Sequence, residues 1–138
     1  METDLNKLRD RAYKCACDHG FHKKEFSDEH LLMLIISEIG EAVNADRKGQ
    51  HAKLKKFERW EKVLDNWSER HRKDFKKCTD YPIEFKIAFG DIKDSVEDEV
   101  ADVAIRLLDF AGVKKLNFND VIIMQYVVTK KKTFPENM

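Results

Sequence analysis

Apolar and polar residues follow one another along most of this chain with the spacing of helices rather than strands. Between Ser27 and Lys48 the inward positions recur at intervals of three and four residues, which is the repeat of one face of an α-helix. The hydroxyl of Ser27 can cap the free amides at the start of such a helix, and Gly49 follows its end. A helix is therefore predicted over this segment.

The same reasoning predicts three or four further helices. They are expected over about 4–18, over about 52–76, from Asp94 or Ser95 to Gly112, and from Asn119 to about Thr129. Only 5 glycines and 2 prolines in 138 residues also suit helices better than a turn-rich β fold. We expect one all-α domain over residues 1–138, a bundle of four to five helices, with a flexible tail from about residue 131.

Charge is balanced overall but uneven along the chain. The 26 basic and 26 acidic residues cancel, so the net charge does not point to DNA or to an anionic membrane as partner. The segment 51–77 carries a net charge of +5, whereas 91–109 carries −5. A basic and an acidic stretch in one small domain would suit a site that holds cations and phosphates together.

Cysteine content and hydropathy indicate a cytoplasmic protein. The chain has three cysteines, Cys15, Cys17 and Cys78. This number is small and odd, which argues against a disulfide framework. The longest apolar run, Leu31 to Ile36, is too short to cross a bilayer.

Paired carboxylates carry the candidate chemistry. Glu38 and Glu41 share the face of the second helix that also holds leucine and alanine, and Glu99 and Asp102 repeat the pair on the fourth helix. Inward carboxylates need a compensating cation, and four oxygen donors favour Mg²⁺, or Mn²⁺ as a substitute. The plainer interpretation is a pair of solvated helix faces with ordinary ion pairs, such as those of Arg106 with Asp102 and Asp109.

Two strings of the sequence resemble a known enzyme family. SEIGEAVNADRKG (Ser37 to Gly49) and SVEDEVADVAIRLLDFAG (Ser95 to Gly112) are similar to the E-x-x-E and E-x-x-D helices of the MazG-like all-α NTP pyrophosphatases, and the resemblance covers most of residues 19 to 112. It implies Mg²⁺ ligation by the four acids and hydrolysis of a nucleoside triphosphate to the monophosphate and pyrophosphate. It also implies a homodimer or homotetramer. The stretch between the two motifs is longer than in compact members and contains the basic inserted helix at 52–76.

Further roles are predicted for residues around the acids. Glu41 is the expected proton acceptor for the attacking water. The candidate phosphate ligands are Arg106, Lys93 and Lys130. The candidates for stacking on the base are Phe21, Phe26, Trp60 and Trp67.

Three other site types compete with the enzyme hypothesis. A di-metal carboxylate bundle uses Glu-x-x-His motifs, and neither acidic pair is followed by a histidine at that spacing. A helical nucleic-acid or nucleotide-binding module would use the segment 53–77, but acids dilute its charge, so nucleic acid is not the expected partner. A zinc site at Cys15, Cys17, His19 and His22 matches no common finger spacing.

Overall fold

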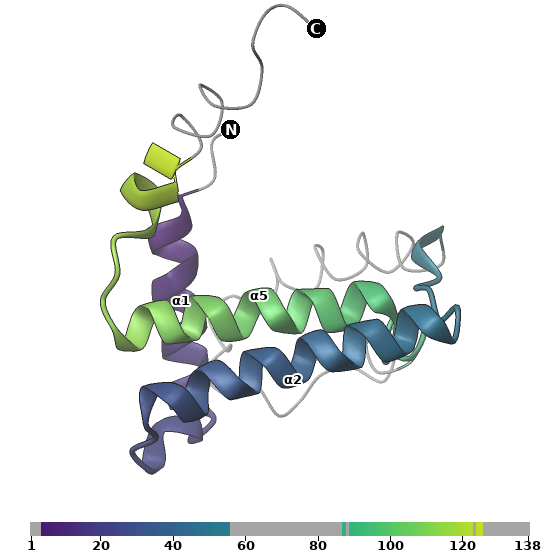
Figure 1. The fold of residues 1–138 in the computed structure, drawn as a ribbon, viewed down its shortest axis with the longest axis horizontal. Helices are drawn as coiled ribbons and strands as arrows, with labels where there is room; N and C mark the ends of the chain where they lie inside the picture. Colours follow the sequence, from purple (N-terminus) through teal and green to yellow (C-terminus); the bar gives the residue numbers. More distant parts are fainter. Residues whose placement is uncertain (1–3, 56–86, 88, 123, 126–138) are drawn as a thin grey trace, which may run out of the picture. The chain divides into compact units, whose positions relative to one another are not determined.

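Every regular element of the described chain is helical. The computed structural model describes residues 4–55, 87, 89–122 and 124–125 (Figure 1). Within them lie α1 (Leu5–Asp18), the 3-10 helix η1 (Phe21–Lys23), α2 (Asp28–Arg47) and α5 (Val96–Val113). Residues 118–122 are helical as well, and no strand occurs in these ranges. The all-α prediction is confirmed, whereas the expected helix at 52–76 lies almost wholly outside the described residues.

Local capping explains where the helices begin and end. The Asp4 carboxylate accepts hydrogen bonds from the amides of Asn6 and Lys7 at the start of α1. After α1 the chain turns at Gly20, whose φ of 78° lies in the left-handed region that favours glycine. The Ser27 hydroxyl accepts a hydrogen bond from the amide of His30, 3.2 Å away, as its predicted capping role requires.

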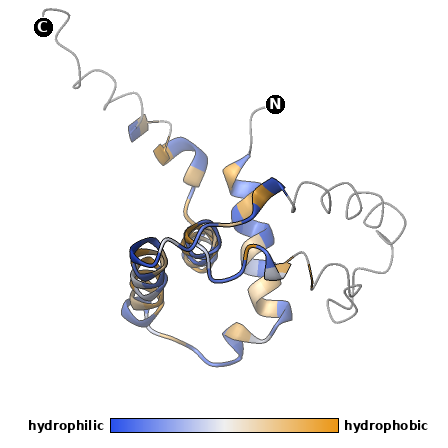
Figure 2. Cartoon of the chain, turned by 90° about the vertical axis from the view of Figure 1, so that its right-hand side faces the viewer, coloured by the Kyte–Doolittle hydropathy of each residue, from blue (hydrophilic) through white to orange (hydrophobic). Residues whose placement is uncertain are grey.

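Contacts divide the chain into two compact units. One comprises Met1–Ile36 with Val103–Met138, and the other is Ser37–Asp102. Both long helices contribute to both units, because α2 and α5 each pass from one to the other. Figure 2 shows hydrophilic and hydrophobic residues interleaved along these helices. No helix in the described ranges is long and apolar enough to span a membrane.

In the first unit, α1 packs closely on the end of α5. A methyl group added at the buried Gly112 would lie only 2.5 Å from Cβ of Tyr13, so the two helices approach each other at this glycine. Asn6 ties the start of α1 to the segment after α5, because its side-chain oxygen accepts a hydrogen bond from the amide of Phe118 at 2.8 Å. Among the residues of this unit that the structure describes, the buried apolar ones are Leu31, Ile35 and Ala111.

In the second unit, hydrogen bonds hold the chain after α2 against the start of α5. The amide of Val96 donates to the carbonyl of Gln50 at 2.9 Å, and the amide of Ala52 donates to the Glu97 carboxylate at 2.9 Å. Ala45 is the buried apolar residue of this unit among those described. These contacts fix the first turn of α5, on which the acidic residues lie.

Candidate metal centre

Three carboxylates from two helices converge in the second unit. Glu38 comes from α2, and Glu99 and Asp102 come from α5. One oxygen of each lies within 4.8 Å of the others, which is close enough for a single ion to contact all three. Glu38 and Glu99 are buried, with 8% and 7% of their surface exposed, and Asp102 is half-buried.

Glu41, the fourth predicted ligand, is exposed and does not belong to this group of three. Along α2 the buried positions are Leu31, Ile35, Glu38 and Ala45. A step of three residues turns a helix by about 60° less than a full turn, so Glu41 falls on the edge of that stripe. The spacing of three and four residues predicted that both glutamates face inward. Glu38 does so, whereas Glu41 lies outside the buried face of α2.

The surroundings of Glu99 disfavour its negative charge. Burial raises the pKa of this carboxyl, and the neighbouring acids Glu41, Asp98, Glu38 and Asp102 raise it further. Glu41 is thus close enough to add to the negative field even though its side chain is exposed. A bound divalent cation or a shared proton would relieve this repulsion.

A second acidic group shares one member with the first. Asp94, Asp98 and Glu99 also bring one oxygen each within 4.8 Å of one another. The Asp98 carboxylate accepts a hydrogen bond from the amide of Asp94 at 3.0 Å, and Asp94 has a positive φ of 59°. This hydrogen bond holds the chain in place just before α5. The sequence analysis assigned no role to Asp94 or Asp98.

The donor set of the three-carboxylate group fits a hard divalent cation. All its ligand atoms are carboxylate oxygens, which Mg²⁺ and Mn²⁺ prefer, and no histidine or cysteine joins the group among the described residues. Water would have to complete an octahedral shell, as is usual for Mg²⁺ in proteins. We therefore regard Glu38, Glu99 and Asp102 as a candidate metal centre.

The other predicted site residues are spread over both units. In the first unit the Arg106 guanidinium lies over the Phe21 ring, 5.7 Å from its centroid, and Phe26 stacks on His30 at 4.6 Å. In the second unit Lys93 is exposed just before α5, and its amide donates to the carbonyl of Phe89. Trp60, Trp67 and Lys130 lie outside the described residues.

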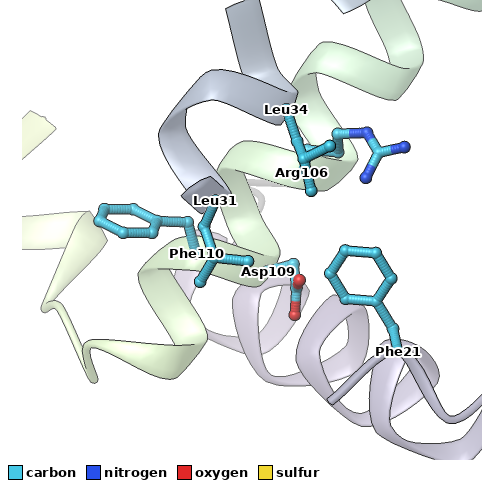
Figure 3. A pocket seen from close by; sticks show the side chains of 6 residues that line it. All are labelled: Phe21, Leu31, Leu34, Arg106, Asp109 and Phe110. Atoms are coloured by element: carbon cyan, nitrogen blue, oxygen red, sulfur yellow. The ribbon is translucent and has the colours of Figure 1, made fainter. Parts of the chain in front are cut away.

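Sequence reasoning missed one polar pair in the first unit, formed by a half-buried histidine and a buried aspartate. Nε2 of His22 lies 2.8 Å and 3.1 Å from the two carboxylate oxygens of Asp109. These residues are 87 positions apart, so no local spacing could have joined them, and Asp109 had been considered only as a partner for Arg106. Figure 3 shows the Asp109 carboxylate beside the Phe21 ring, in a pocket that Arg106 also lines.

Comparison of the chain with protein-family models, with curated proteins and with solved structures gave no match. The resemblance to the NTP pyrophosphatases therefore has only the sequence itself as its support, chiefly the two acidic motifs. What these motifs do has to be argued from the geometry of the residues they contain.

Proposed function

We propose that the protein is a Mg²⁺-dependent hydrolase that cleaves nucleoside triphosphates to the monophosphate and pyrophosphate. The observation that carries the proposal is the convergence of Glu38, Glu99 and Asp102, whose oxygens lie within 4.8 Å of one another while two of the three side chains are buried. Buried like charges are unfavourable unless a positive charge lies among them, and a bound divalent cation would supply that charge, which supports the proposal. The E-x-x-E and E-x-x-D strings that contain these residues support the same enzyme class.

In the proposed mechanism, Glu38, Glu99 and Asp102 would hold the cation. When bound, Mg²⁺ neutralises phosphate oxygens, orients the phosphate chain and lowers the pKa of water. Glu41, which is exposed and adds to the negative field at Glu99, is the proposed acceptor of a proton from the attacking water. The water oxygen forms a bond to the α or the β phosphorus as the anhydride bond between them breaks, and pyrophosphate or the nucleoside monophosphate, respectively, leaves with the bonding electrons.

The remaining roles follow the sequence predictions. Arg106 offers a planar fork that can bind phosphate oxygens, and Lys93 and Lys130 are further cations for them. Phe21 and Phe26, with Trp60 and Trp67, are the proposed aromatic surfaces for the base. The proposed functional form is a homodimer or homotetramer in the cytoplasm, and clearing unwanted nucleotides from the pool is one use of such an activity.

The deciding experiment is a panel of canonical and modified NTPs and dNTPs, assayed for pyrophosphate and monophosphate with Mg²⁺, with Mn²⁺ and with EDTA. The parent should turn over at least one nucleotide with either cation and none in EDTA. Glu38→Gln should lose this activity by roughly 100-fold or more. Glu97→Gln changes an exposed acid on the same helix turn as Glu99 and should remain active. Absence of turnover by the parent with both cations would overturn the proposal.

A further inference from the structure

The long helix α2 carries a second apolar face, which remains exposed. Its buried side is formed by Leu31, Ile35, Glu38 and Ala45. The second face, called the α2 stripe below, consists of four aliphatic residues that are 42–54% exposed: Leu32, Ile36, Ile39 and Val43. With 3.6 residues per turn, these four lie within about 60° of one another and roughly 110° around the helix from the buried side. Because α2 is one continuous helix, this grouping follows from helix geometry alone.

The composition of the α2 stripe is that of a helix-packing surface. The solvent-facing side of a helix is normally polar, whereas every member of this stripe is a large aliphatic residue. The members follow one another at intervals of four, three and four residues, which keeps them in one row along the helix. A contiguous exposed row of this kind marks a surface that packs against a partner.

The α2 stripe is symmetrical about its own midpoint, which lies between Ile36 and Ile39. If a second copy of α2 is laid against it antiparallel, with a two-fold axis at this midpoint, Ile36 lies opposite Ile39 of the second copy. Leu32 likewise lies opposite Val43 of the second copy. Apolar positions then meet apolar positions along the whole row, and this self-complementarity is what a two-fold symmetric dimer requires.

Charges at the two ends of α2 favour the same arrangement. Glu29 near its start and Arg47 at its end are both exposed, and they lie 18 residues apart, which is five full turns. Both therefore fall along one edge of the α2 stripe. In the antiparallel pair Glu29 approaches Arg47 of the second copy, and this ion pair occurs twice. A parallel pair would instead bring each charge against the same charge of the second copy, which is repulsive.

The opposite edge of the α2 stripe carries acids at both ends. Asp28 and Asp46 lie there, so the antiparallel pair brings Asp28 near Asp46 of the second copy. Nζ of Lys114 lies 2.6 Å from the Asp28 carboxylate and supplies a positive charge at this point. The second edge is therefore compensated by a cation of the same chain.

We propose that the α2 stripe is the contact surface of a homodimer, in which α2 packs antiparallel on α2 of a second copy of this chain. This specifies the subunit contact of the homodimer named in the proposed function, and it rests on that function for nothing else. A specific interface buries about 800 Å² on each partner, and a helix of 20 residues is about 30 Å long. Two such helices supply a contact at the low end of this size, so the dimer should dissociate at micromolar concentrations.

Sedimentation equilibrium of the full chain in EDTA, between about 1 and 300 μM, measures the dissociation constant. Ile36→Lys places two like charges near the two-fold axis and should raise this constant roughly 100-fold or more, since the change occurs twice in each dimer. Ile105→Lys is the matched control, because Ile105 on α5 is 53% exposed against 54% for Ile36, and it should stay within about threefold of the parent. A parent that is monomeric throughout this range, or a folded Ile36→Lys protein with the parental constant, would overturn the proposal.

A charge exchange tests the antiparallel direction. Glu29→Arg and Arg47→Glu should each raise the dissociation constant by about threefold or more, because each creates like charges across both copies of the ion pair. The combined variant restores opposite charges and should return to within about twofold of the parent. A combined variant that dimerises no better than the two single ones would overturn the antiparallel pairing. These exposed positions also decide the proposal if Ile36→Lys does not fold.

Assembly and hydrolysis are measured separately. Sedimentation in EDTA needs neither Mg²⁺ nor a nucleotide, so a monomeric parent that hydrolyses a nucleotide would overturn this proposal and retain the proposed activity. A parent that dimerises through the α2 stripe but turns over no nucleotide would do the reverse.

Discussion

Glu97 and Glu99 lie two residues apart in the first turn of α5, yet one carboxylate is held by the backbone and the other is buried among acids. The Glu97 carboxylate accepts a hydrogen bond from the Ala52 amide at 2.9 Å, and this contact is the main cause of its lowered pKa. Burial and four neighbouring acids instead raise the pKa of Glu99. The same turn therefore contains one acid whose charge stabilises the metal-free fold and one whose charge opposes it.

This difference predicts opposite effects of two matched substitutions. Glu99 binds its proton more tightly in the folded state, so its contribution to the free energy of unfolding is greatest below the unfolded pKa. That contribution falls as pH rises from the unfolded value through the raised folded value. Glu99→Gln should therefore melt at or above the parental temperature at pH 7 in EDTA, and its stability should fall less between acidic and neutral pH.

Glu97→Gln is the control, with the reverse sign. The folded pKa of Glu97 is lowered, so its stabilisation is present above the unfolded pKa and is lost as pH falls through the folded value. At pH 7 this variant should melt below the parent, and at acidic pH the two should converge. Thermal melts of all three proteins across that range test both signs. A Glu99→Gln protein that is less stable than Glu97→Gln in EDTA would contradict the description of the acidic group.

The metal ligands can be separated from the proton acceptor by Mg²⁺-dependent stability. An ion at 100 times its dissociation constant stabilises the folded state by about 2.7 kcal/mol. Glu38→Gln removes a buried member of the three-carboxylate group and should lose most of this shift in melting temperature. Glu41→Gln changes an exposed residue outside that group, so we expect the shift to be smaller than in the parent but still present.

Activity completes the assignment of Glu41. If it accepts the proton from water, Glu41→Gln should lower kcat by roughly 100- to 10,000-fold, which is the usual contribution of a general base. Its metal-free stability should equal or exceed that of the parent, because one charge near Glu99 is removed. A Glu41→Gln enzyme with parental kcat, or one that is less stable in EDTA yet keeps the full Mg²⁺ shift, would place Glu41 in a structural ion pair instead.

Arg106 tests whether its planar fork serves binding or only packing. Arg106→Lys keeps the charge but loses the fork and the flat surface over Phe21. A cation–π contact at a partly exposed site contributes about 0.5–1 kcal/mol, so the melting temperature should change little. We expect kcat/KM for the best nucleotide to fall by roughly tenfold or more. Parental kinetics combined with a clear loss of stability would limit Arg106 to a structural role.

The parts of the molecule that local sequence determines were the parts that could be predicted. The Ser27 hydroxyl caps the amide of His30, three residues away, as expected, and the first helix ends at Asp18, where its end was predicted. Glu38 and Glu41 show the limit of periodicity, because a step of three residues left one buried and the other exposed. The contact between His22 and Asp109 joins residues 87 positions apart and depends on how α1, η1 and α5 pack, which no local pattern encodes.

Gly112 provides a test of that packing, with Gly40 as its matched control. Both glycines lie inside long helices, where alanine is intrinsically favoured over glycine by about 0.5–1 kcal/mol. At Gly40 none of the described residues comes within 4 Å of the added methyl group, so Gly40→Ala should stabilise the protein by about that amount.

At Gly112 the methyl group would lie 2.5 Å from Cβ and 3.0 Å from Cγ of Tyr13, and 3.5 Å from the carbonyl oxygen of Arg9. Cβ of Tyr13 is fixed to its backbone, so α1 itself would have to move, and overpacking of this kind costs about 1–3 kcal/mol. Gly112→Ala should therefore be destabilising despite its helix propensity, as measured by urea unfolding of both variants. Equal stabilisation by the two substitutions would mean that α1 does not pack against α5 at this position.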